Sequence, residues 1–168
     1  YYQRQTHSKG KWPNKKKDYC ELSNEEKRRI DELLDRKEIL IFHVTERKVI
    51  GIFNYLERSR FKLRKITNFE LKDTNLSLAA IKLISFSIKK MKNIYKLDLS
   101  NNIFDPECSK FIGDPIKGKE KINELCFSNN NLGPKGAKLL GGVIKGKENT
   151  NTLDLCNNNL GPEGAKCS

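Results

Sequence analysis

One repeat, 28 residues long, fills the C-terminal two thirds of this 168-residue chain. Four stretches, beginning at Ile66, Ile94, Ile122 and Thr150, share one frame without a gap. Each runs apolar, two spacers, apolar, spacer, apolar, two spacers, Asn, spacer, apolar, and the Asn slot is filled in turn by Thr74, Asn102, Asn130 and Asn158. A fixed period of this length predicts stacked copies of one supersecondary unit, here called coils, none of which buries its apolar side alone.

Each coil predicts one strand followed by one helix. Alternating apolar residues such as Leu97 and Leu99 are typical of a strand with one buried face. The Asn that follows is expected to turn the chain and to bond, through its amide, the backbone of its own loop and of the next coil. Gly-Pro pairs then start a helix, whose apolar rows are Leu83/Ile84/Ile88, Phe111/Ile112/Ile116 and Leu139/Leu140/Ile144.

The expected fold class is therefore an α/β solenoid, a horseshoe with a parallel sheet on its concave face and helices on its convex face. Its repeats are residues 66–93, 94–121, 122–149 and an incomplete 150–168. Pro115 falls within the second predicted helix, where an interior proline costs about 3 kcal/mol, so this helix is expected to be short or broken.

Two segments carry a specific resemblance: LCFSNNNLGPKGA at 125–137 and LDLCNNNLGPEGA at 153–165. They resemble the repeats of the leucine-rich repeat family, in its ribonuclease-inhibitor-like subfamily, which includes ribonuclease inhibitor, the GTPase-activating protein of Ran and the NLR immune receptors. The resemblance extends over residues 66–168 and over none of the first 38 residues. It implies a horseshoe that binds a protein on its strand face.

Residues 23–65 are expected to close the N-terminal end of the stack. Ser23 followed by Glu26 is a capping-box signature, and it opens a helix with Ile30, Leu33 and Leu34 on one side. That helix would cap the open edge of the first strand, and an independent interaction helix is the alternative. Residues 39–65 are interpreted as a degenerate coil with Arg47 in the Asn slot, strand slots at Ile39, Phe42, Val44 and Val49, apolar spacers at Leu40 and Ile41, and a helix row of Ile52, Phe53 and Leu56.

Residues 1–22 lack apolar periodicity and are interpreted as a basic, extended or disordered arm. The arm combines cations with an aromatic ring, in Lys9, Lys11, Trp12, Lys15, Lys16 and Lys17. Such an arm suits the phosphates and bases of a nucleic acid. An unstructured tail and a nuclear-import signal at residues 15–17 are the alternatives.

No catalytic, metal or cofactor site is expected, and the chain is interpreted as a non-enzyme. The sequence has no G-x-x-x-x-G-K-[ST] phosphate loop and no G-x-S-x-G nucleophile turn. Its five cysteines form no C-x-x-C pair, so reduced thiols in an intracellular, cytoplasmic protein are favoured, with the nucleus or an organelle as alternatives. His43 is expected in an outward strand slot beneath the cap helix, and Cys126 and Cys156 as diagonal neighbours on the strand face.

The strand face is the predicted partner-binding surface. The slot between the two buried strand residues holds Glu70, Asp98, Cys126 and Asp154, which predicts an acidic stripe on a chain of net charge +12. The flanking residues of this predicted site are Lys72, Tyr95, Lys96 and Glu124. The predicted helices carry much of the lysine, at Lys82, Lys89, Lys90, Lys110, Lys117, Lys138 and Lys145.

The function predicted from these features is non-catalytic protein recognition or scaffolding through the concave face. One alternative is a structural subunit of a large ribonucleoprotein or ciliary assembly, docked through the basic arm and the convex lysines. Another is a GTPase-activating protein, although residues 66–168 contain no arginine. No run of ~20 apolar residues predicts a membrane span. The last coil stops within its helix, so further repeats or a partner are expected to cover it.

Overall fold

The computed structural model describes residues 21–145 and 147–162, and over these ranges the chain is an α/β protein. Five parallel strands form one sheet in chain order: β1 (Glu38–Phe42), β2 (Asn68–Lys72), β3 (Lys96–Asp98), β4 (Glu124–Cys126) and β5 (Thr152–Asp154). The helices are α1 (Asn24–Asp35), α2 (Glu46–Leu56), α3 (Arg60–Leu63), α4 (Leu78–Lys90), α5 (Pro106–Ile116) and α6 (Gly133–Ile144), and η1 (Glu57–Ser59) is a 3-10 turn. No helix in the described ranges is both long and apolar enough to span a bilayer.

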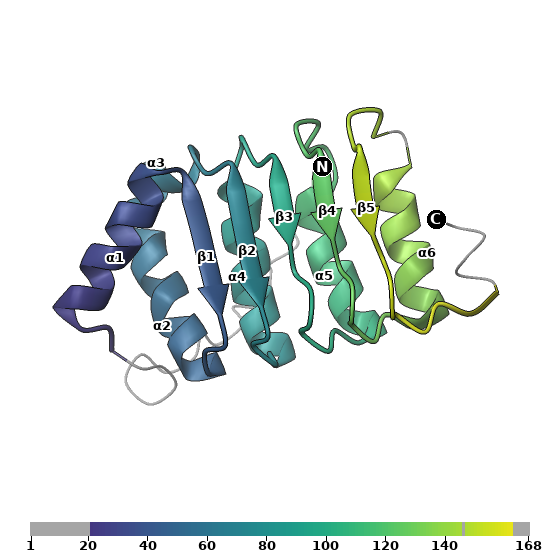
Figure 1. Cartoon of the computed structure of the whole chain (residues 1–168), viewed down its shortest axis with the longest axis horizontal. Coiled ribbons are helices and arrows are strands. Elements are labelled where there is room, and N and C mark those ends of the chain that lie inside the picture. Colours follow the sequence, from purple (N-terminus) through teal and green to yellow (C-terminus); the bar gives the residue numbers. More distant parts are fainter. Residues whose placement is uncertain (1–20, 146, 163–168) are drawn as a thin grey trace, which may run out of the picture.

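Helices cover one face of the sheet. In Figure 1 the strands lie side by side in one layer, α2, α4, α5 and α6 pack behind them, and α1 closes the end beside β1. Within the described ranges the opposite face carries no helix, and we call it the helix-free face. The core between the two layers is apolar, and its least exposed strand and helix residues include Phe69, Leu97, Leu125, Ile84, Ile112 and Leu140.

The repeat frame predicted for the last four strands is confirmed by their pairing. Phe69 lies opposite Leu97, Leu97 opposite Leu125, and Leu125 opposite Leu153, so each strand is offset from the next by one repeat. The constant offset keeps the apolar residues of every strand on the helix side, because a slip of one residue would turn them to the other face.

The frame predicted for the first coil, which aligned Ile39 with Ile66, is wrong. Ile39 pairs instead with Phe69, and Ile41 pairs with Leu71. Ile41, expected as a spacer, is therefore a core residue only 5% exposed. Val49 and Arg47 belong to α2, and not to a strand slot and the Asn slot. The first coil is longer than the later coils, because η1 and α3 add a turn before β2 that the later coils lack. This extra turn shifts the first strand relative to the repeat frame.

The predicted N-terminal helix is confirmed as α1. Ser23 Oγ accepts from Glu26 N at 3.2 Å and Glu26 Oε2 accepts from Ser23 N at 2.8 Å, so the capping box is complete. Leu34 is buried and Ile30 packs against the core. Leu22, assigned by sequence to the arm, is also buried. Residues 1–20, with the six arm residues named above, lie outside the described ranges.

The buried ladder positions bond successive coils to one another. Asn130 Nδ2 donates to two carbonyls of its own loop and, at 2.9 Å, to Leu99 O of the preceding coil. Asn130 Oδ1 accepts from Asn102 N at 3.1 Å and from Phe104 N at 3.0 Å. Asn102 bonds the coil before it in the same way, and its Oδ1 accepts from Thr74. The amides therefore reach the preceding coil, whereas the sequence predicted the next one.

A second Asn stands directly before each ladder Asn, and its backbone explains the doublet. Asn101, Asn129 and Asn157 have φ angles of 58°, 53° and 55°. This left-handed region is unfavourable for most side chains, and Asn tolerates it better than most. The first Asn of each pair thus makes the turn, and the second bonds the backbone inside it.

Helix α5 was predicted to be short or broken; it is continuous over 11 residues and ends one residue after Pro115, so it is not broken, and it is shorter than α4 and α6. Pro115 has no N–H, and it therefore cannot bond Phe111 O four residues earlier. Ser85 Oγ on α4 donates to that same carbonyl at 2.8 Å. The neighbouring helix supplies the donor that the proline removes, and the helix persists through its last turn.

Apolar exposure rises toward the C-terminal end of the described chain. In equivalent helix slots Leu83 is 7% exposed and Leu139 is 43% exposed. In equivalent strand slots Leu125 is 1% exposed and Leu153 is 37% exposed. Leu139, expected in a buried row, is open because the described ranges hold no complete helix beyond α6.

We expect Ser85→Ala to lower the free energy of unfolding by about 1–3 kcal/mol, because it leaves Phe111 O without its donor. In a Pro115→Ala background the restored N–H can bond Phe111 O, so the same substitution should cost clearly less. Chemical denaturation of the four proteins in this cycle measures the coupling between the two sites. An equal cost of Ser85→Ala in both backgrounds would contradict this role for Ser85.

Candidate functional site

The helix-free face presents two rows of side chains that the strand register aligns across the sheet. One row consists of Leu40, Glu70, Asp98, Cys126 and Asp154. The row before it consists of Glu38, Asn68, Lys96, Glu124 and Thr152. The register thus brings together the strand residues that the sequence assigned to one partner-binding surface.

Over β2 and β3 the face is a connected network of four charges. Lys72 Nζ lies 2.6 Å from Asp98 Oδ2 and 3.1 Å from Glu70 Oε2. Lys96 Nζ lies 2.6 Å from Glu70 Oε1. These side chains are between 8% and 32% exposed, so the network is partly withdrawn from water. The acidic stripe predicted from Glu70 and Asp98 is therefore wrong as a statement of charge, because two lysines neutralise both carboxylates.

The pKa values of this network show that its members are held in their charged forms. Burial alone would raise the pKa of the Asp98 carboxyl, but hydrogen bonds from Lys72 and Ser100 outweigh burial and hold it below its usual value. Burial also opposes the charge on Glu70, and the two lysines lower the pKa of that carboxyl overall. The pKa of Lys96 is raised, chiefly by its hydrogen bond to Glu70.

Toward β5 the face holds thiols and a carboxylate. Cys126 Sγ lies 3.4 Å from Asp154 Oδ2, and Asp154 Oδ1 accepts from Cys156 N at 3.0 Å. Burial raises the pKa of the Cys126 thiol, and the hydrogen bond with Asp154 raises that of Cys156. A protonated thiol is a poor nucleophile and a poor metal ligand. In residues 21–145 and 147–162, no cluster of three or more His, Cys, Asp or Glu could hold a metal ion.

The sequence predicted that His43 lies beneath the cap helix, and this prediction is wrong. His43 follows the end of β1, and its side chain is 78% exposed. Its Nε2 lies 3.8 Å from Asp73 Oδ2 in the next strand-to-helix loop. The corrected frame of the first coil explains the difference, because β1 ends one residue before His43.

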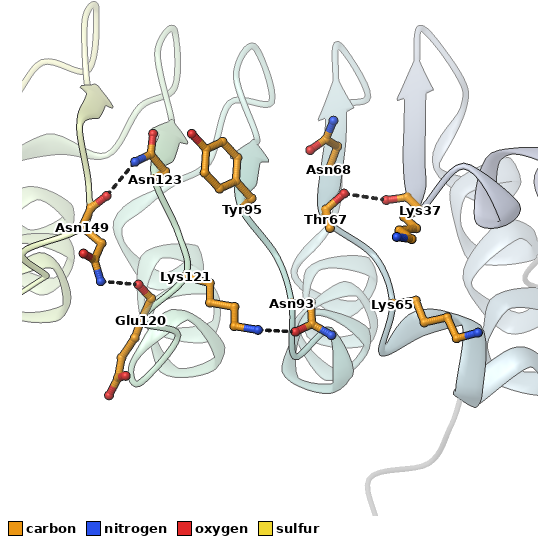
Figure 2. Close-up of a pocket in the computed structure, with 10 residues that line it drawn as sticks. All are labelled: Lys37, Lys65, Thr67, Asn68, Asn93, Tyr95, Glu120, Lys121, Asn123 and Asn149. Atoms are coloured by element: carbon orange, nitrogen blue, oxygen red, sulfur yellow. Dashed lines mark hydrogen bonds between the residues drawn. The ribbon is translucent and has the colours of Figure 1, made fainter.

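A groove of about 1030 Å³ runs along the edge where the strands begin, and Figure 2 shows the residues that line it. Apart from Asn68, the first residue of β2, they come from five consecutive helix-to-strand connections. Tyr95, 46% exposed, lies between Asn123 and Thr67 in this view. Backbone bonds fix that order, since Tyr95 N donates to Thr67 O at 2.7 Å and Asn123 N donates to Tyr95 O at 2.9 Å.

Tyr95 belongs to both the predicted site and this groove, whereas several lysines and amides of the groove were not predicted. Among them are Lys37, Lys65, Asn93, Lys121 and Asn149. The sequence held a signal for two of them, because the Lys-Gly-Lys-Glu segment 117–120 recurs one repeat later at 145–148 and directly precedes Lys121 and Asn149. This polar period accompanies the apolar one, but apolar periodicity alone does not reveal it.

Acid should destabilise the fold partly through Asp98. Its pKa is lowered in the folded chain, so its contribution to stability is present above the unfolded carboxyl pKa near ~4 and is lost as the pH falls through the folded value. We expect the free energy of unfolding, measured by urea denaturation, to fall between about pH 5 and pH 3, and to fall less steeply in Asp98→Asn. Identical pH dependence in the two proteins would contradict this assignment.

Comparisons with known proteins assign no family to the chain, since no family model and no curated protein matches it.

Proposed function

We propose that the chain is a leucine-rich repeat solenoid of the ribonuclease-inhibitor-like kind, curved into a horseshoe, and that it recognises a protein partner. The helix-free face is the concave binding side in this proposal. The one-repeat offset between strands and the buried Asn ladder both support it. Both features are expected of coils that supply each other's missing surface.

Charged side chains on the helix-free face are already held in place by salt bridges, and this feature is the main support for the binding proposal. Glu70, Lys72, Lys96 and Asp98 are held by one another before any partner arrives. Immobilising such a side chain on binding otherwise costs about 0.5–1.5 kcal/mol, so a partner meets a surface that needs little further ordering. Tyr95 adds an exposed ring of the kind enriched at protein interfaces.

Recognition without catalysis is favoured by the state of the thiols. The pKa of Cys108 is raised to about 12, by burial first and by Asp105 second. The raised pKa values of Cys126 and Cys156 likewise keep those thiols protonated. All three are free cysteines, which supports a reducing, intracellular and cytoplasmic location as part of this proposal.

We further propose that additional repeats or a partner cover the β5 edge of the sheet. Leu139 and Leu153 are exposed there, whereas the equivalent residues of earlier coils are covered. Among the described residues, Asn158 Oδ1 is buried without a hydrogen-bond partner. An uncovered strand edge also presents unpaired backbone groups to other chains.

Amide hydrogen exchange tests the proposal for the β5 edge. In the monomeric chain without a partner, residues 152–160 should exchange much faster than residues 96–104, because the terminal coil has a neighbour on one side only. The earlier coil is the internal control, since it carries the same strand and loop between two neighbours. Equally slow exchange in the two segments would show that the last coil is stable as it stands.

Charge reversal tests the binding face. Glu124 lies beside Lys96 on the helix-free face, and Glu107 is exposed on α5 at the other side of the molecule. With a partner identified by cross-linking and mass spectrometry, Glu124→Lys should weaken the affinity roughly tenfold or more, as expected of a charge buried in an interface. Glu107→Lys makes the same charge change and should leave the affinity within about twofold. Equal effects of the two variants would count against the helix-free face.

A further inference from the structure

The sheet has one border where its strands begin and another where they end, and these two borders differ in charge. The helix-to-strand connections, residues 36–37, 64–67, 91–95, 117–123 and 145–151, hold ten Lys or Arg and two Glu. The strand-to-helix connections at the opposite edge, residues 43–45, 73–77, 99–105 and 127–132, hold two Asp and no Lys or Arg. We call the first edge, uppermost in Figure 1, the basic edge.

Several lysines elsewhere in the described chain form salt bridges with carboxylates, whereas the cations of the basic edge do not. Lys48 pairs with Glu26, Lys72 with Asp98, and Lys90 with Glu57. Between residues of the described ranges, no salt bridge involves a Lys or Arg of the basic edge. Lys92 and Lys147 lie close enough to Lys119 for their charges to lower its pKa, so these cations add to a positive potential at the edge.

Two lysines of this edge have a structural task. Lys119 Nζ donates to Met91 O at 2.6 Å, and Lys147 Nζ donates to Lys119 O at 2.9 Å. They tie each connection to the preceding one near the helix C-termini, where carbonyls and the helix dipole favour cations. Burial first, and then the charges of Lys92 and Lys147, lower the pKa of Lys119 to about 8.

Three further lysines, Lys92, Lys117 and Lys145, are exposed. Lys92 and Lys117 line a cavity of about 310 Å³ between the ends of α4 and α5. This cavity shares Glu120 and Lys121 with the larger groove that contains Tyr95. Exposed cations and an exposed aromatic ring therefore border two hollows that share lining residues.

We propose that the basic edge binds single-stranded nucleic acid, with its phosphates along the lysines of successive connections and a base stacked on Tyr95. Lys117 and Lys145 occupy equivalent positions in successive coils, as do Lys119 and Lys147, and neighbouring parallel strands and packed helices lie ~4.8 Å and ~8–10 Å apart. A row of cations suits a chain of phosphates better than it suits a single anion. An exposed ring beside such a row is the usual stacking platform for an unpaired base.

An acidic polypeptide would engage the same lysines, whereas a base stacked on Tyr95 adds affinity that a purely acidic polypeptide cannot supply. The sequence preference should be weak, because the groove amides are largely used within the protein: Asn93 bonds Lys121 and Arg64 O, and Asn149 bonds Glu120 O. Phosphate contacts and stacking remain as the main sources of affinity.

Fluorescence anisotropy of the full chain with a labelled oligouridylate tests this inference across a range of salt concentrations. The edge variant combines Lys92→Gln, Lys117→Gln and Lys145→Gln. The control combines Lys82→Gln, Lys110→Gln and Lys138→Gln, three exposed helix lysines at one-repeat spacing. Both triple variants change the net charge equally and keep residues 1–20, so any contribution of those residues cancels.

The edge variant should bind roughly tenfold or more weakly at low salt, and the slope of log affinity against log salt should shrink by about 2, as expected for three lost phosphate contacts on a single strand. The control should stay within about twofold of the unmodified chain. Equal losses in the two triple variants would overturn the proposal, because binding would then depend on net charge alone. Circular dichroism melting verifies that each variant is folded.

A second variant separates nucleic acid from an acidic polypeptide. Tyr95→Ala should weaken oligouridylate binding roughly fivefold or more and leave the salt slope unchanged, because stacking releases no counterions. Polyglutamate at equal charge concentration should displace the oligonucleotide poorly. If Tyr95→Ala has no effect, or if polyglutamate competes equally well, the edge is a site for acidic protein and the proposal fails. These readouts use no protein partner, so they are independent of the function proposed for the helix-free face.

Discussion

The buried Asn amide of each coil is the interaction on which the regular part of this structure depends. Asn102 and Asn130 each bond backbone groups of two coils at once, so their position fixes the distance along the chain from one coil to the next. An inserted residue would leave buried polar groups unpaired, at about 1–3 kcal/mol each. The first coil has no such Asn, and it is the coil whose offset to its neighbour differs.

The same repeat produces two surfaces that differ in charge: one carries paired opposite charges, and the other carries mainly positive charges. On the helix-free face, lysines and carboxylates from neighbouring strands meet and neutralise one another. At the basic edge, Lys117 and Lys145 occupy equivalent positions of successive coils, as do Lys119 and Lys147. In a repeat protein, a residue type that recurs at one position of each repeat forms a row along the molecule. A recurring lysine therefore makes an extended charged surface and not an isolated charge.

Sequence periodicity was sufficient for β2 to β5 and for the positions of the Asn ladder, because one spacing served both strand and loop, but it did not give the direction of the ladder bonds. It failed for β1, where Ile39, Leu40, Ile41 and Phe42 are all apolar and alternation cannot choose between the two faces. It also failed at Pro115, because the compensating donor, Ser85, lies on another helix. The ion network over β2 and β3 depends on contacts across strands, which a single chain pattern does not contain.

The direction of the Asn bonds has a consequence for how the molecule is made. Each ladder amide reaches back to the coil that precedes it, so a loop acquires its full set of partners only when the following coil is present. A chain leaving the ribosome at about 5–20 residues per second must wait roughly 1–6 seconds for that following coil. During synthesis the newest coil therefore always lacks some of its hydrogen bonds, and folding follows translation with a delay of one coil.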